Sequence, residues 1–384
     1  MKVFHCDHCG HLLFFENTHC VRCGQLVAYL PDLAIVGSLD KDPDKDPDKD
    51  PDKDPDIDPD IDNDQNAEDN DHTVTWRSPL KAAAGRTYRL CRNYTQEQVC
   101  NWAVVAGDSN SLCVSCRLTR VIPDLATGEH RQAWYRLEVA KRRLIFTLLQ
   151  LRLPIVSRDD DPERGLAFEF KADAPDCGAV LTGHATGIIT INVAEADDAE
   201  RERRRNALGE PYRALAGHLR HESGHYYWDR LIQDAGAFDG FRQVFGDERS
   251  DYNAALQTYY AEGAPADWQD RFISAYASAH PLEDWAETWT HYLHMVDTVE
   301  TAAACGIWLQ PRRSDEPSLS RVPPYVASED TPFEQLIDSW FPVTYALNEL
   351  NRGLGLADPY PFVWSGPAID KLRYVHEIVR HARS

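Results

Sequence analysis

Apolar positions recur with a helical period through much of the second half of the chain. Between residues 132 and 151 they stand three or four residues apart, which predicts a helix that ends before Pro154: Leu137, Ala140, Leu144, Leu148 and Leu151. Residues 187–193 instead alternate β-branched side chains and predict a strand. Further helices are expected over 211–231, from Pro281 through 295, and again after 333. This mixture predicts an α+β fold in which helices dominate.

Four cysteines in the first 36 residues have the spacing of a zinc ribbon. They form two Cys-x-x-Cys pairs, each followed by glycine and separated by ten residues: Cys6, Cys9, Cys20 and Cys23. Four thiolates complete a tetrahedral Zn²⁺ site with no open position, so the predicted zinc is structural. The alternative, a redox-active Cys-x-x-Cys, lacks the βαβ context of such motifs. A ribbon of this kind typically stabilises a chain or docks a protein partner.

A second cysteine cluster lies within residues 76–128. Its last two members form a Cys-x-x-Cys pair, whereas eight residues separate the first two: Cys91, Cys100, Cys113 and Cys116. One interpretation is a second structural zinc site. The other is a small β-rich core, packed around Trp102, that contains four reduced cysteines.

The negative charge of the chain is concentrated between the two cysteine clusters. The formal net charge is −22, and residues 40–71 contribute −12 of it through fifteen Asp and one Glu against four Lys. A Lys-Asp-Pro-Asp repeat fills residues 40–62, where a proline at every fourth position excludes helix and sheet. Residues 37–75 are therefore interpreted as an extended acidic linker. Weak binding of cations by its aspartates is an alternative, although the glycine turns of calcium loops are missing.

Composition excludes several classes of partner. No basic stripe long enough to bind a nucleic acid is present. The longest apolar segment, 144–156, contains Gln150 and Arg152 and is too short to cross a bilayer. The N-terminus leads directly into a cysteine pair rather than into an apolar signal segment, so a cytoplasmic location is expected.

The sequence His-Glu-Ser-Gly-His begins at residue 221, within one of the predicted helices. On a helix, His221 and His225 share one face, so both imidazoles can bind one metal ion. Glu222 would lie beside the open coordination position and act as the general base toward a zinc-activated water. Gly224 leaves room for a neighbouring element. His218, one turn earlier, is a further candidate ligand, although a surface or supporting role is the simpler interpretation.

A third, acidic ligand is expected from a later helix. Glu283 and Glu287 lie on one face of it, among tryptophans, where buried carboxylates need a metal or a histidine as partner. One of them can bind zinc while the other accepts a hydrogen bond from a zinc-bound histidine; two solvent-facing glutamates are the alternative. Asp229, one turn after His225, is another candidate, either as a rival ligand or as a supporting partner of the ligands.

Two more features fit a hydrolytic metal site. Tyr276 lies seven residues before Glu283, and a phenol near zinc can donate to the oxyanion of a tetrahedral intermediate, although a lone Tyr is more often a core residue. The strand at 187–193 precedes the motif helix. It would serve as the edge along which an extended peptide binds, or simply as a core strand.

These motifs together resemble a bacterial family that joins a zinc ribbon to a zinc-binding metallopeptidase domain. The resemblance extends over nearly the whole chain and is carried by the ribbon cysteines and by residues 91–94, 100–102, 113–116, 121–125, 181–184, 191–197, 221–229 and 283–289. The acidic repeat departs from the family as an insertion, in keeping with its interpretation as a linker. The resemblance implies the fold and the metal more directly than the substrate.

The site layout is also similar, over a short stretch, to the peptidase domain of anthrax lethal factor, a gluzincin. That resemblance implies Glu283 as the third zinc ligand, Glu287 as the partner of a zinc-bound histidine, and Tyr276 as the oxyanion donor. A helix-rich gluzincin-like domain is therefore expected over 129–384, behind the ribbon (1–36), the linker (37–75) and the Cys-rich module (76–128).

The resulting hypothesis is a zinc-dependent peptidase acting on a peptide or protein substrate. It would hold one catalytic zinc at His221, His225 and Glu283, one structural zinc in the ribbon, and a further structural zinc if the second cluster binds one. A non-catalytic, zinc-stabilised binding protein is one alternative, against which the presence of Glu222 argues because binding zinc requires no base there. A zinc hydrolase of a non-peptide amide is another.

Overall fold

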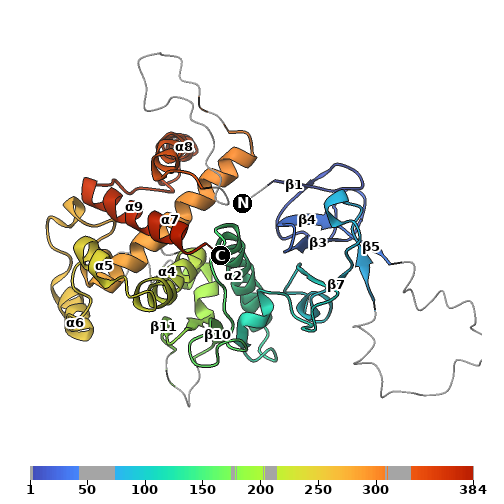
Figure 1. The fold of residues 1–384 in the computed structure, drawn as a ribbon, viewed down its shortest axis with the longest axis horizontal. Helices are drawn as coiled ribbons and strands as arrows, with labels where there is room; N and C mark the ends of the chain where they lie inside the picture. The colour runs from blue at the N-terminus through green and yellow to red at the C-terminus, as the bar shows by residue number, and fades with distance from the viewer. Residues whose placement is uncertain are drawn as a thin grey trace, which may run out of the picture. The chain divides into compact units, whose positions relative to one another are not determined.

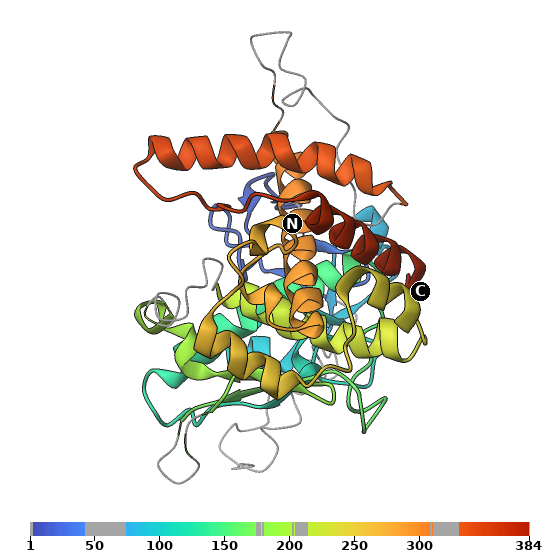
Figure 2. The same ribbon diagram turned by 90° about the vertical axis from the view of Figure 1, so that its left-hand side faces the viewer.

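The computed structural model describes residues 3–42, 74–173, 178, 180–201, 203, 214–307, 309 and 330–383. These residues form two compact units, Val3–Arg117 and the chain from Leu118 onward. Figures 1 and 2 show the helices and strands of both units. Most of the segment interpreted as an acidic linker, 43–73, lies outside the described residues.

The first unit consists of short antiparallel strands. Two hairpins pair β1 with β2 and β3 with β4, and a four-stranded sheet has the order β5-β6-β7-β8. Its elements are β1 (Phe4–His5), β2 (Leu12–Leu13), β3 (Val27–Leu30), β4 (Ile35–Ser38), β5 (Asp40–Lys41), β6 (Trp76–Arg77), β7 (Tyr88–Leu90), α1 (Arg92–Thr95) and β8 (Ala103–Val105).

The ribbon and the second cysteine cluster interlock within this unit. Tyr29 of β3 forms a bridge with Trp102, and the two rings lie 4.3 Å apart between centroids. The Asn101 side chain donates to the carbonyl of Phe15, and the Tyr94 hydroxyl donates to that of Thr18 at 2.8 Å. Both aromatic side chains of the bridge are fully buried. The modules expected at 1–36 and 76–128 therefore share one core, and the ordered ribbon continues past residue 36 through β4 and β5.

The second unit contains a mixed sheet with the strand order β11-β12-β10-β9. β10 pairs in parallel with β9 and β12, whereas β11 pairs antiparallel with β12. The strands are β9 (Thr119–Val121), β10 (Ala167–Lys171), β11 (Gly183–Ala185) and β12 (Ile188–Asn192). The strand predicted at 187–193 is thus β12, but it is an interior strand, so the idea that it forms the peptide-binding edge was wrong. The edge next to it is β11.

Helices make up the rest of the second unit. They are α2 (His130–Gln150), α4 (Leu215–Trp228), α5 (Phe238–Phe245), α6 (Tyr252–Glu262), α7 (Pro281–Ala304), α8 (Phe333–Gly353) and α9 (Gly366–His381). A π-helical turn, Asp229–Gln233, continues α4. Helix α7 packs on α4, α8 and α9 (Figure 2). His280 caps its start by accepting the Leu282 N–H, and Pro281 occupies the first turn, where proline is tolerated.

The α+β fold with a helix-rich second unit is confirmed. The helices expected at 132–151 and from Pro281 are α2 and α7, and that expected at 211–231 is described from Leu215. Among the described residues, no helix is both long and apolar enough to cross a bilayer.

Candidate functional site

Helices α4 and α7 approach each other closely at Gly224. A Cβ added at this glycine would lie 2.9 Å from the Cα of Ala286 and 3.2 Å from the Trp289 ring. The contact is held by two indole N–H groups of α7, since Trp285 donates to the carbonyl of Gly224 at 2.8 Å and Trp289 to the hydroxyl of Ser223 at 3.1 Å. Only glycine permits this approach, which sets Glu283 and Glu287 opposite the histidines of α4.

Three candidate ligands converge where the two helices face each other. Nε2 of His221 lies 3.3 Å from Nε2 of His225 and 3.1 Å from Oε2 of Glu283. Oε1 of Glu283 is 3.6 Å from Nε2 of His225. One ligand atom from each residue lies within 4.8 Å of the others, which is the arrangement that one tetrahedral metal ion requires of three ligands.

The donors and acceptors of these three residues fit a cation. Nδ1 of His221 lies 2.8 Å from Oε1 of Glu287 and donates to that carboxylate, so a neutral His221 directs a lone pair from Nε2 toward Glu283. Oε2 of Glu283 is buried and accepts no hydrogen bond. Lone pairs on buried atoms this close repel each other unless a positive charge lies among them. Zn²⁺, with a His₂Glu set, matches this donor chemistry.

The charges of the site attract a cation, which either a proton on His221 or a metal ion can supply. Burial alone would lower the pKa of His221, but the carboxylates of Glu283 and Glu287 raise it well above its usual value. Burial would raise the pKa of Glu283, whereas His225 and His221 lower it to about 2. The carboxylates are thus held ionised and ready to bind a cation.

The two histidines of the centre are partly exposed. The side chains of His221 and His225 retain 14% and 16% exposure, whereas Glu283 retains 1%. Glu222 is buried, which raises its pKa to about 7; the charge of His221 opposes this shift and that of Glu283 adds to it. A carboxyl group whose pKa lies near neutrality can both take up and release a proton.

Three further side chains complete the surroundings of the ligands. The ring of Tyr276, in the turn Tyr276–Ser278, lies 6.0 Å from the ring of His221. Ser274 donates to Oε2 of Glu287 at 2.6 Å, and Tyr252 donates to Oε1 of Glu283 at 2.5 Å. Sequence reasoning missed Ser274 and Tyr252, because neither has a motif-like spacing from the residue that it contacts.

Two other candidates lie outside the converging group. Asp229 opens the π-helical turn, and its charged neighbours are Arg164, Asp234 and Arg230. Nδ1 of His218 lies 3.6 Å from Oε2 of the buried Glu195. Helical spacing made both residues candidate metal ligands, but their side chains lie near other charged groups.

The edge strand β11 brings His184 next to the histidine pair. Its ring lies parallel to that of His225, with 6.3 Å between centroids. Nε2 of His184 accepts the Gly187 N–H at 3.0 Å, so the neutral ring carries its proton on Nδ1. Burial, with a further contribution from His225, lowers the pKa of His184 to about 3. Sequence reasoning missed this residue as well.

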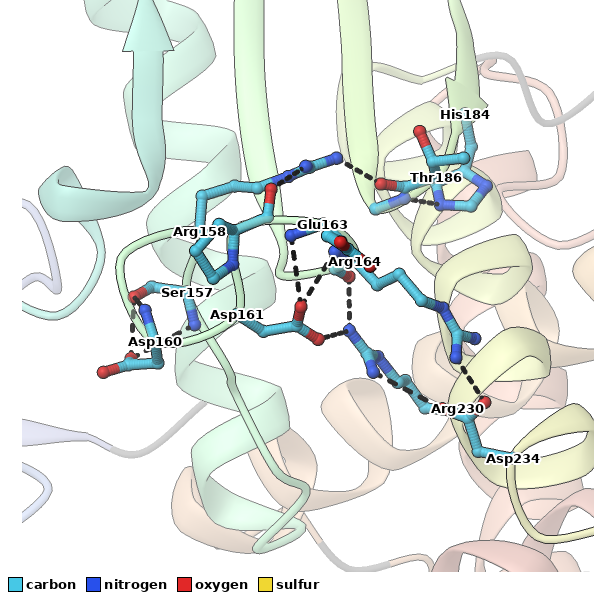
Figure 3. Close-up of polar contacts among 12 residues, drawn as sticks. Ser157, Arg158, Asp160, Asp161, Glu163, Arg164, His184, Thr186, Arg230 and Asp234 are labelled. Carbon is cyan, nitrogen blue, oxygen red and sulfur yellow. Dashed lines mark hydrogen bonds and ion pairs between the residues drawn. The ribbon is translucent and has the colours of Figure 1, made fainter.

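A network of hydrogen bonds and ion pairs connects the turn after β11 to the π-helical turn that continues α4 (Figure 3). Arg158 donates to the carbonyl of Thr186, and Asp161 accepts from Arg230 at 2.8 Å. Arg164 pairs with Asp234 at 2.6 Å across the same network. Because Arg230 belongs to the π-helical turn that continues α4, the edge strand and α4 are both held to one loop, 157–165.

Both cysteine clusters have the dimensions of closed zinc sites. Sulfur atoms lie 3.7 Å apart in the pair Cys6–Cys23, 3.6 Å in Cys9–Cys20 and 3.8 Å in Cys100–Cys113. A tetrahedron with Zn–S bonds of about 2.3 Å has edges of roughly 3.8 Å, whereas a disulfide is about 2.05 Å long. All four sulfurs of each cluster lie close enough to share one ion. This geometry favours zinc over four reduced, unliganded thiols in the second cluster.

Comparison with known proteins agrees with these sites. Residues 130–378 match the family model of a putative zinc-binding metallo-peptidase, and residues 3–56 and 59–127 match that of a zinc-ribbon domain. Uncharacterized proteins of Mycobacterium bovis and Mycobacterium tuberculosis are 38% identical over 381 residues, which cover 99% of this chain and 95% of theirs. No solved structure matches the chain, so the similarity to anthrax lethal factor stays a prediction. The chain belongs to the putative zinc-binding metallo-peptidase family and carries a zinc ribbon ahead of the peptidase domain.

Proposed function

We propose that the protein is a zinc-dependent peptidase whose active site is the centre formed by His221, His225 and Glu283. The observation that carries the proposal is the convergence of their ligand atoms in a partly open site beside a buried Glu222 whose pKa lies near 7. A site that only stores or binds zinc has no use for such a base. When bound, zinc would polarise the scissile carbonyl and lower the pKa of the attacking water.

The residues of the chain divide the remaining tasks. Glu222 takes the proton of the attacking water and passes it to the leaving amine. Glu287 orients His221 through Nδ1, and Ser274 fixes Glu287 in turn. Burial and the charge of Glu283 raise the pKa of Tyr276, so its phenol remains protonated and can donate to the oxyanion.

An extended peptide is the substrate shape that this site favours. β11 forms the edge of the described sheet beside the metal-binding helix, and among the described strands only β12 pairs with it. A substrate strand would pair with the outer backbone groups of β11. Docking of a protein partner on the ribbon, where Phe14 and Val21 are exposed, stays a separate prediction.

Zinc content and peptide cleavage, measured on the same samples, test the proposal. His221→Ala should lose one zinc per chain relative to the wild type, and Glu222→Gln should keep that zinc while cleavage of a peptide library falls by about 10²- to 10⁴-fold. An unchanged zinc count in His221→Ala would refute the metal site. Zinc binding by wild-type protein that cleaves neither peptides nor small amides would favour a non-catalytic binding protein, and cleavage of small amides alone would favour an amide hydrolase.

A further inference from the structure

Tyr252 contacts the candidate metal ligand Glu283 through Oε1, the oxygen that also lies 3.6 Å from Nε2 of His225. Its hydroxyl donates to Oε1 of Glu283 at 2.5 Å, whereas Oε2 lies 3.1 Å from Nε2 of His221 and accepts no hydrogen bond. The two oxygens of one carboxylate thus have different surroundings. Oε1 accepts a hydrogen bond from a neutral hydroxyl, whereas Oε2 faces His221.

The position of Tyr252 is fixed by the residues just before it and by the cap of α7. Asp251 caps α6 by accepting the Ala254 N–H at 3.0 Å. Because Nδ1 of His280 accepts the Leu282 N–H, its Nε2 carries the proton and donates to the carbonyl of Ser250 at 3.1 Å. The Tyr252 ring packs edge-on against His280, with 5.1 Å between centroids. The residue that starts α7 therefore also holds the segment that presents Tyr252 to Glu283.

We infer that Tyr252 is a positioning residue for the zinc ligand Glu283. Its hydroxyl holds Oε1 and thereby fixes the carboxylate with Oε2 directed at His221 before the metal arrives. Without that hydroxyl, the carboxylate can rotate between orientations and must be ordered again when zinc binds. The inference rests on the proposed zinc site and adds a ligand-orienting residue from α6, a helix that contributes no ligand.

The expected loss of zinc affinity follows from the effect of side chains that hydrogen-bond to metal ligands in other metalloproteins. Removing a hydrogen bond to a ligand typically weakens metal binding by about 10- to 100-fold. Tyr252→Phe removes only the hydroxyl and keeps the ring against His280. Since α6 contains no buried residue among those described, the core of the second unit does not depend on this side chain and the variant should fold.

Zinc binding by the full-length protein at buffered free zinc concentrations tests the inference. His221→Ala supplies the background of the cysteine sites, which is subtracted at each concentration. Tyr252→Phe should raise the Kd of the remaining site by about 10-fold or more. Tyr260→Phe is the matched control: its hydroxyl is on the same helix but interacts with Tyr276 rather than with a ligand, so its Kd should stay within about twofold of wild type.

A second variant separates the hydroxyl from the ring. Tyr252→Leu also removes the packing on His280, so with zinc in the cysteine clusters alone it should melt at a lower temperature than Tyr252→Phe. Equal zinc Kd values for the two variants, both weaker than wild type, would support a role of the hydroxyl. A wild-type Kd in Tyr252→Phe, or a loss that appears only in Tyr252→Leu, would overturn the inference. If His221→Ala loses no zinc, the zinc site itself fails, and the inference with it.

Discussion

The cysteine centres of the first unit and the histidine–glutamate centre of the second differ in how completely the protein surrounds the metal position. Each cysteine cluster provides four sulfur ligands, whereas the other centre provides three ligands. Four ligands leave no position for a substrate; three leave one. The number of protein ligands thus separates a site that stabilises the fold from one that can carry out chemistry.

The surroundings differ in the same sense. The second cluster is closed by backbone N–H groups that point at sulfur, such as those of Cys113 to Cys91 and Cys116 to Cys113. The open centre is instead surrounded by side chains with transferable protons, among them Glu222 and Tyr276. Backbone donors can only stabilise charge, whereas a carboxyl group and a phenol can also move or share a proton.

Removal of one ligand from each kind of centre should give the largest contrast. Cys113→Ser should lose one zinc and unfold Val3–Arg117, because apparent zinc-binding energies of structural sites, about 10–16 kcal/mol, exceed the stability of a small domain. His221→Ala should lose one zinc and keep its fold. Zinc analysis and limited proteolysis of both variants measure this. If the first unit of Cys113→Ser stayed resistant to protease, the cysteine centre would not be needed for folding, and the two kinds of centre would not differ in this respect.

The phenol of Tyr276 should matter only for turnover. Tyr276→Phe should lower kcat by about 100-fold, with KM and zinc content close to wild type, because its hydroxyl is proposed to act only in the transition state. Steady-state kinetics on a cleaved peptide measure the split. A rise in KM at unchanged kcat would instead assign Tyr276 to substrate binding, and no change would remove it from the site.

The edge strand beside the open centre can be disturbed without touching a ligand. Gly187 has φ +84°, and a Cβ there would lie 2.4 Å from the carbonyl oxygen of Arg164. Gly187→Ala should therefore destabilise the second unit by about 2–3 kcal/mol. Gly183→Ala, at a position with no heavy atom within 4 Å, is the control and should change stability little. Denaturant unfolding compares the two, and equal stabilities would show that the turn after β11 is not held as tightly as the network in Figure 3 implies.

Sequence spacing predicted the parts of these sites that are local. A four-residue interval on a helix was enough to bring His221 and His225 together, and cysteine pairs were enough to mark both clusters. Tyr252, Ser274 and His184 contact their partners across 31, 13 and 41 residues, and such pairings are decided by the packing of α6, α7 and β11 rather than by a period. The edge strand was missed for the same reason, because three-residue β11 carries no alternation that could be recognised.

Removing a hydrogen bond to one metal ligand in each kind of centre should give the smallest effects, and it compares the centres most directly. Glu287→Gln weakens the partner that orients His221 and should raise the zinc Kd of the open centre by about 10-fold. Ser38 lies 3.6 Å from Cys6 in the ribbon, where three further thiolates hold the metal, so Ser38→Ala should change ribbon affinity by less than about threefold. Chelator competition on both variants provides the two ratios. Comparable losses would mean that a closed centre depends on its outer partners as much as an open one, and that ligand number alone does not explain why only one of them is suited to chemistry.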